Sequence, residues 1–134
     1  MQLFKILVRL PDKDYVAPEI KLDRRSCHFN GCISAIDGTH ISAHIRRDNG
    51  YRSWRNRKGR ISQNVLVAVK FDGSFTYMLA GAKGSMHNAK LLFRALNRHY
   101  LRIPKARYYL GDAAFSSTRG IVTLFGFLGA PDSL

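Results

Sequence analysis

The segment SQNVLVAVKFDGSFTYMLAGA, residues 62–82, limits the possible folds of this chain more than any other part of it. Two runs rich in β-branched and aromatic residues are joined at Asp72-Gly73, a dipeptide that favours the tight turn of a β-hairpin. Residues 62–82 therefore predict two antiparallel strands.

Three further elements flank this hairpin. The run CISAIDGTHI, residues 32–41, predicts a strand that kinks just after Asp37, where Gly38 follows. Apolar residues at helical spacing behind Ser85, a candidate N-cap, predict a helix over residues 86–100. The run ARYYLGDAAF, residues 106–115, predicts a strand that ends at Asp112. The predicted fold is α/β, in the order strand, strand, strand, helix, strand, after a connecting segment at residues 11–30.

Two aspartates are expected to meet in this fold. If the helix crosses over the sheet, the last strand lies parallel to the first and beside it, which places Asp37 next to Asp112. Two bare carboxylates repel each other unless the pKa of one rises or a divalent cation lies between them. Oxygen ligands suit Mg²⁺ or Mn²⁺, and a pair of such ions can hold the attacking and leaving oxygens of a phosphodiester. The alternative is that each aspartate only ends its strand, in a turn or as a cap.

The charge of the chain predicts a polyanionic partner. There are 22 Lys and Arg against 9 Asp and Glu, a net charge of +13, so nucleic acid is the first candidate and an anionic membrane surface the second. Residues 46–60 predict a solvated basic loop in which arginines contact phosphates and aromatic rings stack on bases. The predicted DNA-binding residues are Arg46, Arg47, Arg52, Trp54, Arg55, Arg57, Lys58 and Arg60. The apolar run at residues 1–14 is too short and too charged for a signal peptide or a membrane span.

Three blocks of the sequence resemble the DDE-type endonuclease domain of PIF/Harbinger transposases and of the domesticated nucleases derived from them. They are AIDGTHI at residues 35–41, residues 51–88, and YYLGDAAF at residues 108–115. The resemblance implies a ribonuclease-H-like mixed sheet and DNA cleavage by divalent metal held on two aspartates and a third acid. It makes Asp37 and Asp112 the first two catalytic metal ligands, with Gly38 leaving room for the substrate backbone. A nuclear location is predicted from the basic patch RNRKGR at residues 55–60.

The chain also departs from this family. Similar proteins carry the third acid on a helix several tens of residues after the second, whereas only 22 residues follow Asp112 and the one later acid is Asp132. Asn88 stands where relatives commonly have an acid. We therefore expect a fragment: a connecting segment at residues 1–30 from a missing N-terminal helical region, and a partial DDE nuclease domain at residues 31–134, truncated at its C-terminal end. The competing interpretation is a catalytically inactive DNA-binding or protein-interaction remnant. A separate DNA-binding protein is a further candidate partner.

Three polar residues near the expected site have two interpretations each. His87 and Asn88 lie at the start of the predicted helix, where capping is the expected role and support of the metal site the alternative. His40 follows Asp37 by three residues and so points to the opposite face of an extended strand. Packing or indirect support of the site is therefore expected for His40, rather than direct ligation.

A spacing of C-x4-C-x7-H-x3-H, from Cys27 to His44, superficially resembles a zinc finger. Its spacer is too short, and its second half lies on a predicted strand where a finger needs a helix. Both cysteines are instead expected to be buried small hydrophobic residues.

Overall fold

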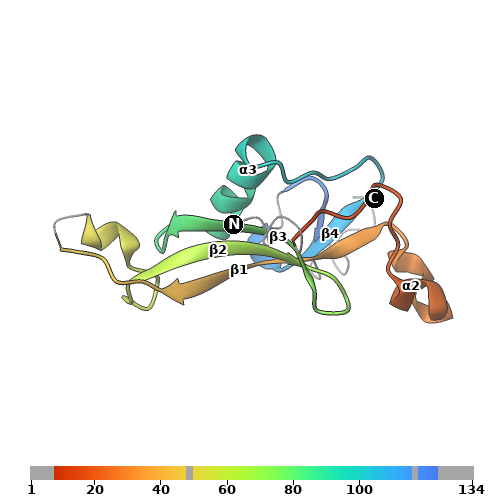
Figure 1. Ribbon diagram of the computed structural model, residues 1–134, viewed down its shortest axis with the longest axis horizontal. Helices are drawn as coiled ribbons and strands as arrows, with labels where there is room; N and C mark the ends of the chain where they lie inside the picture. Colours follow the sequence, from red (N-terminus) through yellow and green to blue (C-terminus); the bar gives the residue numbers. More distant parts are fainter. Residues whose placement is uncertain (1–7, 48–49, 116–117, 124–134) are drawn as a thin grey trace.

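The structure of the chain is a computed structural model that describes residues 8–47, 50–115 and 118–123. It is a mixed α/β fold with a five-stranded sheet of order β3-β2-β1-β4-β5. The strands are β1 (Cys32–Ser42), β2 (Ser62–Val69), β3 (Phe75–Lys83), β4 (Tyr108–Gly111) and β5 (Ile121–Thr123). Helix α3 (Asn88–Arg98) lies over one face of the sheet, and α2 (Pro18–Leu22) lies beyond one end of it (Figure 1). Three 3-10 helices complete the described elements: η1 (Arg24–Phe29), η2 (Tyr51–Trp54) and η3 (Ala113–Phe115).

The predicted hairpin is confirmed as the antiparallel pair β2 and β3. Its loop is closed by two backbone hydrogen bonds, from Lys70 N–H to Ser74 O at 2.9 Å and from Gly73 N–H to Lys70 O at 3.0 Å. Gly73 has φ +85°, a left-handed conformation that glycine adopts without steric cost. The Asp72 carboxylate accepts hydrogen bonds from the hydroxyl and the N–H of Ser74, which hold the pKa of Asp72 below its ordinary value.

The predicted order of strands around the crossover helix is also confirmed. Strand β1 pairs antiparallel with β2 and parallel with β4, and α3 connects β3 to β4. The predicted kink after Asp37 is wrong, because the ladder between β1 and β2 runs without a break from Ala35 to Ser42. Strand β5, which no pattern indicated, adds a fifth strand parallel to β4. A three-residue strand is too short to show a period in the sequence.

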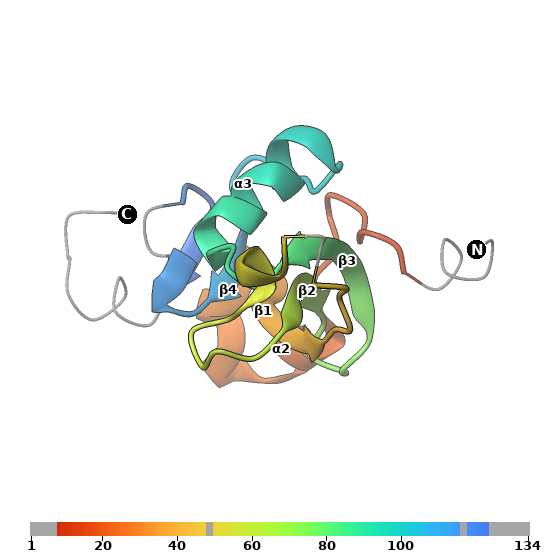
Figure 2. The same ribbon diagram turned by 90° about the vertical axis from the view of Figure 1, so that its left-hand side faces the viewer.

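Figure 2 shows α3 over one face of the sheet, and the main buried cluster lies between the two. Leu91, Leu92 and Ala95 of α3 are buried against sheet residues that include Ile36 and Tyr109. The helix is shorter than predicted, because its N-cap is His87 and not Ser85. The Asn64 side chain donates a hydrogen bond to the carbonyl oxygen of Met86 at 2.9 Å. This hydrogen bond holds the residues before His87 outside the helix.

Residues 11–30, predicted to be a connecting segment, contain α2 and η1 and pack against the sheet. Ala17 and Ile20 form a second buried cluster with Cys32 at the start of β1. Arg107 lies directly before β4, and its guanidinium donates hydrogen bonds to the carbonyl oxygens of Lys13 (2.7 Å), Gly31 (3.2 Å) and Tyr15. The segment is therefore attached to the sheet along its length. The expected domain boundary at residue 30 stays a prediction.

Candidate functional site

Asp37 lies in the middle of β1, with its side chain on the sheet face opposite α3. Its neighbours point the other way: Ile36 is in the core, and a Cβ on Gly38 would lie 2.6 Å from Asn88 Cγ. Because side chains alternate along a strand, the Asp37 carboxylate points away from the helix, where it is exposed. One of its oxygens accepts a hydrogen bond from Gly38 N–H at 2.7 Å.

Asp112 follows the last residue of β4, at the position equivalent to Asp37 on the neighbouring parallel strand. Ala35 of β1 pairs with Leu110 of β4. Asp37 and Asp112 each lie two residues after this pair. Asp112 Oδ1 accepts a hydrogen bond from Ala114 N–H at 2.9 Å, so this aspartate also caps η3, as the alternative interpretation expected. The other carboxylate oxygen of each aspartate has no hydrogen-bond partner among the described residues.

The two carboxylates have the chemistry that a hard divalent ion needs, namely exposed oxygen donors on adjacent strands. In the described part of the chain, however, no group of three or more His, Cys, Asp or Glu residues could hold a metal ion. Asp132, the candidate third acid, lies outside the described residues. Both cysteines were expected to be buried: this is confirmed for Cys32 and wrong for Cys27, which is exposed. The roles of Asp37 and Asp112 as metal ligands stay predictions.

His40 lies on the opposite face from Asp37, as predicted. Its Nδ1 is 3.0 Å from the hydroxyl of Ser62, a buried residue of β2. This hydrogen bond places His40 on the side of the sheet that carries α3, away from Asp37.

The capping role expected for His87 and Asn88 is wrong. His87 is the N-cap residue of α3, but its side chain makes no capping hydrogen bond. Asn88 Oδ1 instead accepts a hydrogen bond from Asn64 Nδ2 at 2.8 Å. The space at Gly38, expected to receive substrate backbone, is filled by the Asn88 side chain. Asn64 was missed from the sequence, although an asparagine in the apolar run QNVLVAV was an available signal.

A cavity of about 520 Å³ opens at the start of α3, and we call it the α3 cavity. One wall is the turn at residues 56–60, which is held by the Asn56 side chain accepting hydrogen bonds from the N–H groups of residues 58 and 60. The opposite wall is the start of α3, and Asp112 lies at its edge. The charged and histidine residues that line it are His40, Arg57, Lys58, Arg60, His87 and Asp112.

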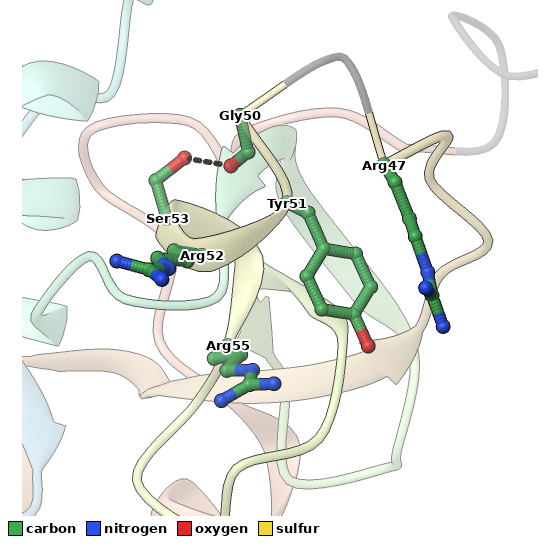
Figure 3. A pocket seen from close by; sticks show the side chains of 6 residues that line it. All are labelled: Arg47, Gly50, Tyr51, Arg52, Ser53 and Arg55. Atoms are coloured by element: carbon green, nitrogen blue, oxygen red, sulfur yellow. Dashed lines mark hydrogen bonds between the residues drawn. The ribbon is translucent and has the colours of Figure 1, made fainter.

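A second cavity, of about 740 Å³, surrounds η2, and we call it the η2 pocket. Figure 3 shows the side chains of Arg47 and Tyr51 extending in the same direction, with Arg55 close to the tyrosine. The Arg55 guanidinium lies 5.4 Å from the centroid of the Tyr51 ring, a cation–π contact. Trp54, predicted to stack on bases, is half-buried and does not line this pocket.

The predicted DNA-binding cations therefore divide between two cavities, except Arg46, which lines neither. They have no carboxylate partner in the part of the chain that the structure describes, where the one ion pair joins Asp23 and Arg25 at 3.4 Å. Gly84 lets the connection before α3 pass close to Trp54, and Ser85 N–H donates to Ser53 O at 3.3 Å. These contacts attach the basic loop to the start of α3.

The fold and the site define a mixed α/β protein with one carboxylate on β1, a second just after the end of the parallel strand β4, and a cationic surface. Residues 36–127 match the DDE superfamily endonuclease family, a span that includes both aspartates and the basic loop. The chain belongs to this family, whose members typically depend on divalent metal. No curated protein and no solved structure matches the chain. Within the described residues, no helix has the length and apolar character to cross a membrane.

Proposed function

We propose that this chain is the nuclease domain of a PIF/Harbinger-type transposase, or of a domesticated protein derived from one, with a ribonuclease-H-like fold. Its activity is cleavage of DNA phosphodiester bonds with Mg²⁺ or Mn²⁺. The observation that carries the proposal is the parallel pairing of β1 with β4, because Asp37 and Asp112 each follow the pair of Ala35 and Leu110 by two residues. Family membership and the sheet order β3-β2-β1-β4-β5 support it.

In this mechanism, Asp37 and Asp112 hold the divalent metal with their carboxylate oxygens. The N–H groups of Gly38 and Ala114 each bind one oxygen and thereby orient the carboxylates. A divalent metal held there would supply activation of the attacking oxygen and stabilisation of the leaving oxygen. The basic loop binds phosphates of the same DNA, and neutralising about four to six of them predicts a slope near −4 to −5 in log K against log salt.

Nicking of a supercoiled plasmid in Mn²⁺ tests this function. We expect slow nicking by the wild-type chain and its loss in Asp37→Asn and in Asp112→Asn, because each change removes one anionic oxygen ligand. Asp72→Asn in the hairpin loop, an exposed aspartate outside the site, should nick like the wild type. Nicking that persists in both site variants would show that other residues, or a contaminant, cut the DNA.

The second candidate function is DNA binding without cleavage. The absence of a third metal-binding acid among the described residues favours it, because a weakly held metal positions the reacting oxygens poorly. A titration with Mg²⁺ and Mn²⁺ separates the two functions. A non-catalytic remnant binds DNA equally with and without metal and never nicks it.

Two further parts of the proposal concern the cell. We propose a nuclear location, because RNRKGR at residues 55–60 is a basic patch of the kind that nuclear import recognises. We also propose that a separate DNA-binding protein supplies target recognition. A fluorescent fusion with Arg57, Lys58 and Arg60 changed to Gln should lose nuclear enrichment.

A further inference from the structure

We propose that the α3 cavity, whose lining includes Asp112 but not Asp37, binds a backbone phosphate of the DNA strand. The inference rests on the proposed DNA substrate and adds the place where one phosphate is held. The cavity has cationic side chains on one wall and the start of an 11-residue helix on the other. Both features attract anions.

The start of α3 supplies free backbone donors. The first hydrogen bond of the helix runs from Leu91 N–H to His87 O at 3.0 Å. The N–H groups of residues 88–90 therefore have no acceptor within the helix. The His87 side chain does not cap them. Free N–H groups and the positive end of the helix dipole together make a helix start suitable for phosphate.

The cationic wall comes from the turn at residues 56–60. Arg57, Lys58 and Arg60 line the cavity, and none has a carboxylate partner in the described part of the chain. The charges of this wall can therefore be compensated by a phosphate diester, which is a permanent anion. Asp112 at the cavity edge is the one carboxylate in its lining.

An independent feature of the cavity is a buried polar atom without a partner. Asn64 lines the cavity and is 1% exposed, and its Oδ1 has no hydrogen-bond partner among the described residues. Its Nδ2 is already used by Met86 O and Asn88 Oδ1. A buried acceptor without a donor costs free energy. Because Oδ1 is fully buried, a donor reaches it only if the cavity wall shifts. A water molecule admitted in this way would donate one hydrogen to Asn64 Oδ1 and the other to a phosphate oxygen.

The test uses a substitution that separates anion binding from folding. His87→Asp places a carboxylate at the N-cap, where aspartate is a favourable residue, so the helix keeps or gains stability. The same carboxylate occupies the anion site. We expect duplex DNA binding to weaken by about three- to tenfold and the magnitude of the salt slope to fall by about 0.9, the value for one phosphate contact.

Two variants are matched controls. His87→Asn caps the helix without charge, so it occupies the same N–H groups but adds no repulsion, and it should weaken binding less than His87→Asp. Asn97→Asp adds one negative charge near the other end of α3 and should retain wild-type affinity. Arg60→Gln, on the opposite wall, should lose affinity and slope as His87→Asp does. All binding is measured by fluorescence anisotropy in EDTA, so that failure of the nuclease proposal leaves this result unaffected.

Two outcomes would overturn the proposal. One is folded His87→Asp that binds DNA with wild-type affinity and salt slope. The other is equal weakening by Asn97→Asp, which would show that only net charge matters. Titration with inorganic phosphate distinguishes the source of the anion. Saturable shifts of the amide resonances of residues 88–90, together with unchanged DNA binding by His87→Asp, would indicate a small-anion site and reject the DNA subsite.

Discussion

The side chain of Asn88 fills the space beside Gly38 that any larger residue would need. A Cβ on Gly38 would lie 2.6 Å from Asn88 Cγ, and Asn88 is held there by the hydrogen bond from Asn64. Helix α3 therefore contacts β1 at the residue next to Asp37. This contact joins the start of the helix to the strand that carries the first carboxylate.

Gly38→Ala should destabilise the chain by about 1–3 kcal/mol, the usual effect of adding a methyl group to a packed site. The new methyl group displaces Asn88, and the start of α3 with it. Urea unfolding of the single variant and of Gly38→Ala/Asn88→Ala measures the effect. The double variant should recover part of the loss, since the clashing amide is gone. Equal loss in both would mean that the clash is not with Asn88.

Asn88→Ala alone should destabilise the chain by about 1 kcal/mol, because one acceptor of the buried Asn64 amide is removed. Asn88→Asp retains an oxygen that can accept this hydrogen bond and should be less harmful. Chemical denaturation of the three proteins gives the comparison. If Asn88→Asp is the more destabilising variant, the hydrogen bond is not what holds the helix start.

Arg107→Met should destabilise the chain by roughly 1.5–3 kcal/mol, the range for hydrogen bonds to a charged group. It removes the donors to the carbonyl oxygens of Lys13, Tyr15 and Gly31. Arg107→Lys should not restore stability, because an ammonium group lacks the planar fork of donors. Arg102→Met, at an exposed position, is the control. Hydrogen exchange should increase over residues 11–30 in the Arg107 variants, and unchanged exchange there would contradict this role.

Stability should decrease above pH 9. Burial raises the pKa of the Cys32 thiol from 9.0 to about 11, so the folded chain keeps this proton at a pH where the unfolded chain loses it. The contribution of Cys32 is therefore complete below pH 9 and is lost between pH 9 and 11. Burial also raises the pKa of Tyr77 and of Tyr109 from 10.0 to about 12, which extends the loss to higher pH.

The urea midpoint measured from pH 8 to pH 11 checks this prediction. Cys32→Ala should show a shallower decrease between pH 9 and 10, where the tyrosines contribute least. A midpoint that rises with pH over this range would contradict it.

The sequence by itself determined the hairpin, the crossover and the parallel pairing of β1, which carries Asp37, with β4, which ends just before Asp112. These features depend on local turn chemistry, on the alternation of side chains and on the need of a parallel strand for a long connection. The basic loop at residues 46–60 could also be predicted, because its charge follows directly from its amino-acid composition. Harbinger membership and the metal remain proposals drawn from the resemblance.

Only the tertiary structure decided which groups meet across long separations. Three contacts each join segments far apart in the chain. They are the contact between Gly38 and Asn88, the hydrogen bond from Asn64 to Asn88, and the hydrogen bonds from Arg107 to carbonyl oxygens in residues 13–31. The hydrogen bond from Ser85 N–H to Ser53 O likewise joins the basic loop to the segment before α3. Such contacts leave no period or motif, because they depend on how elements pack and not on the sequence of any one element.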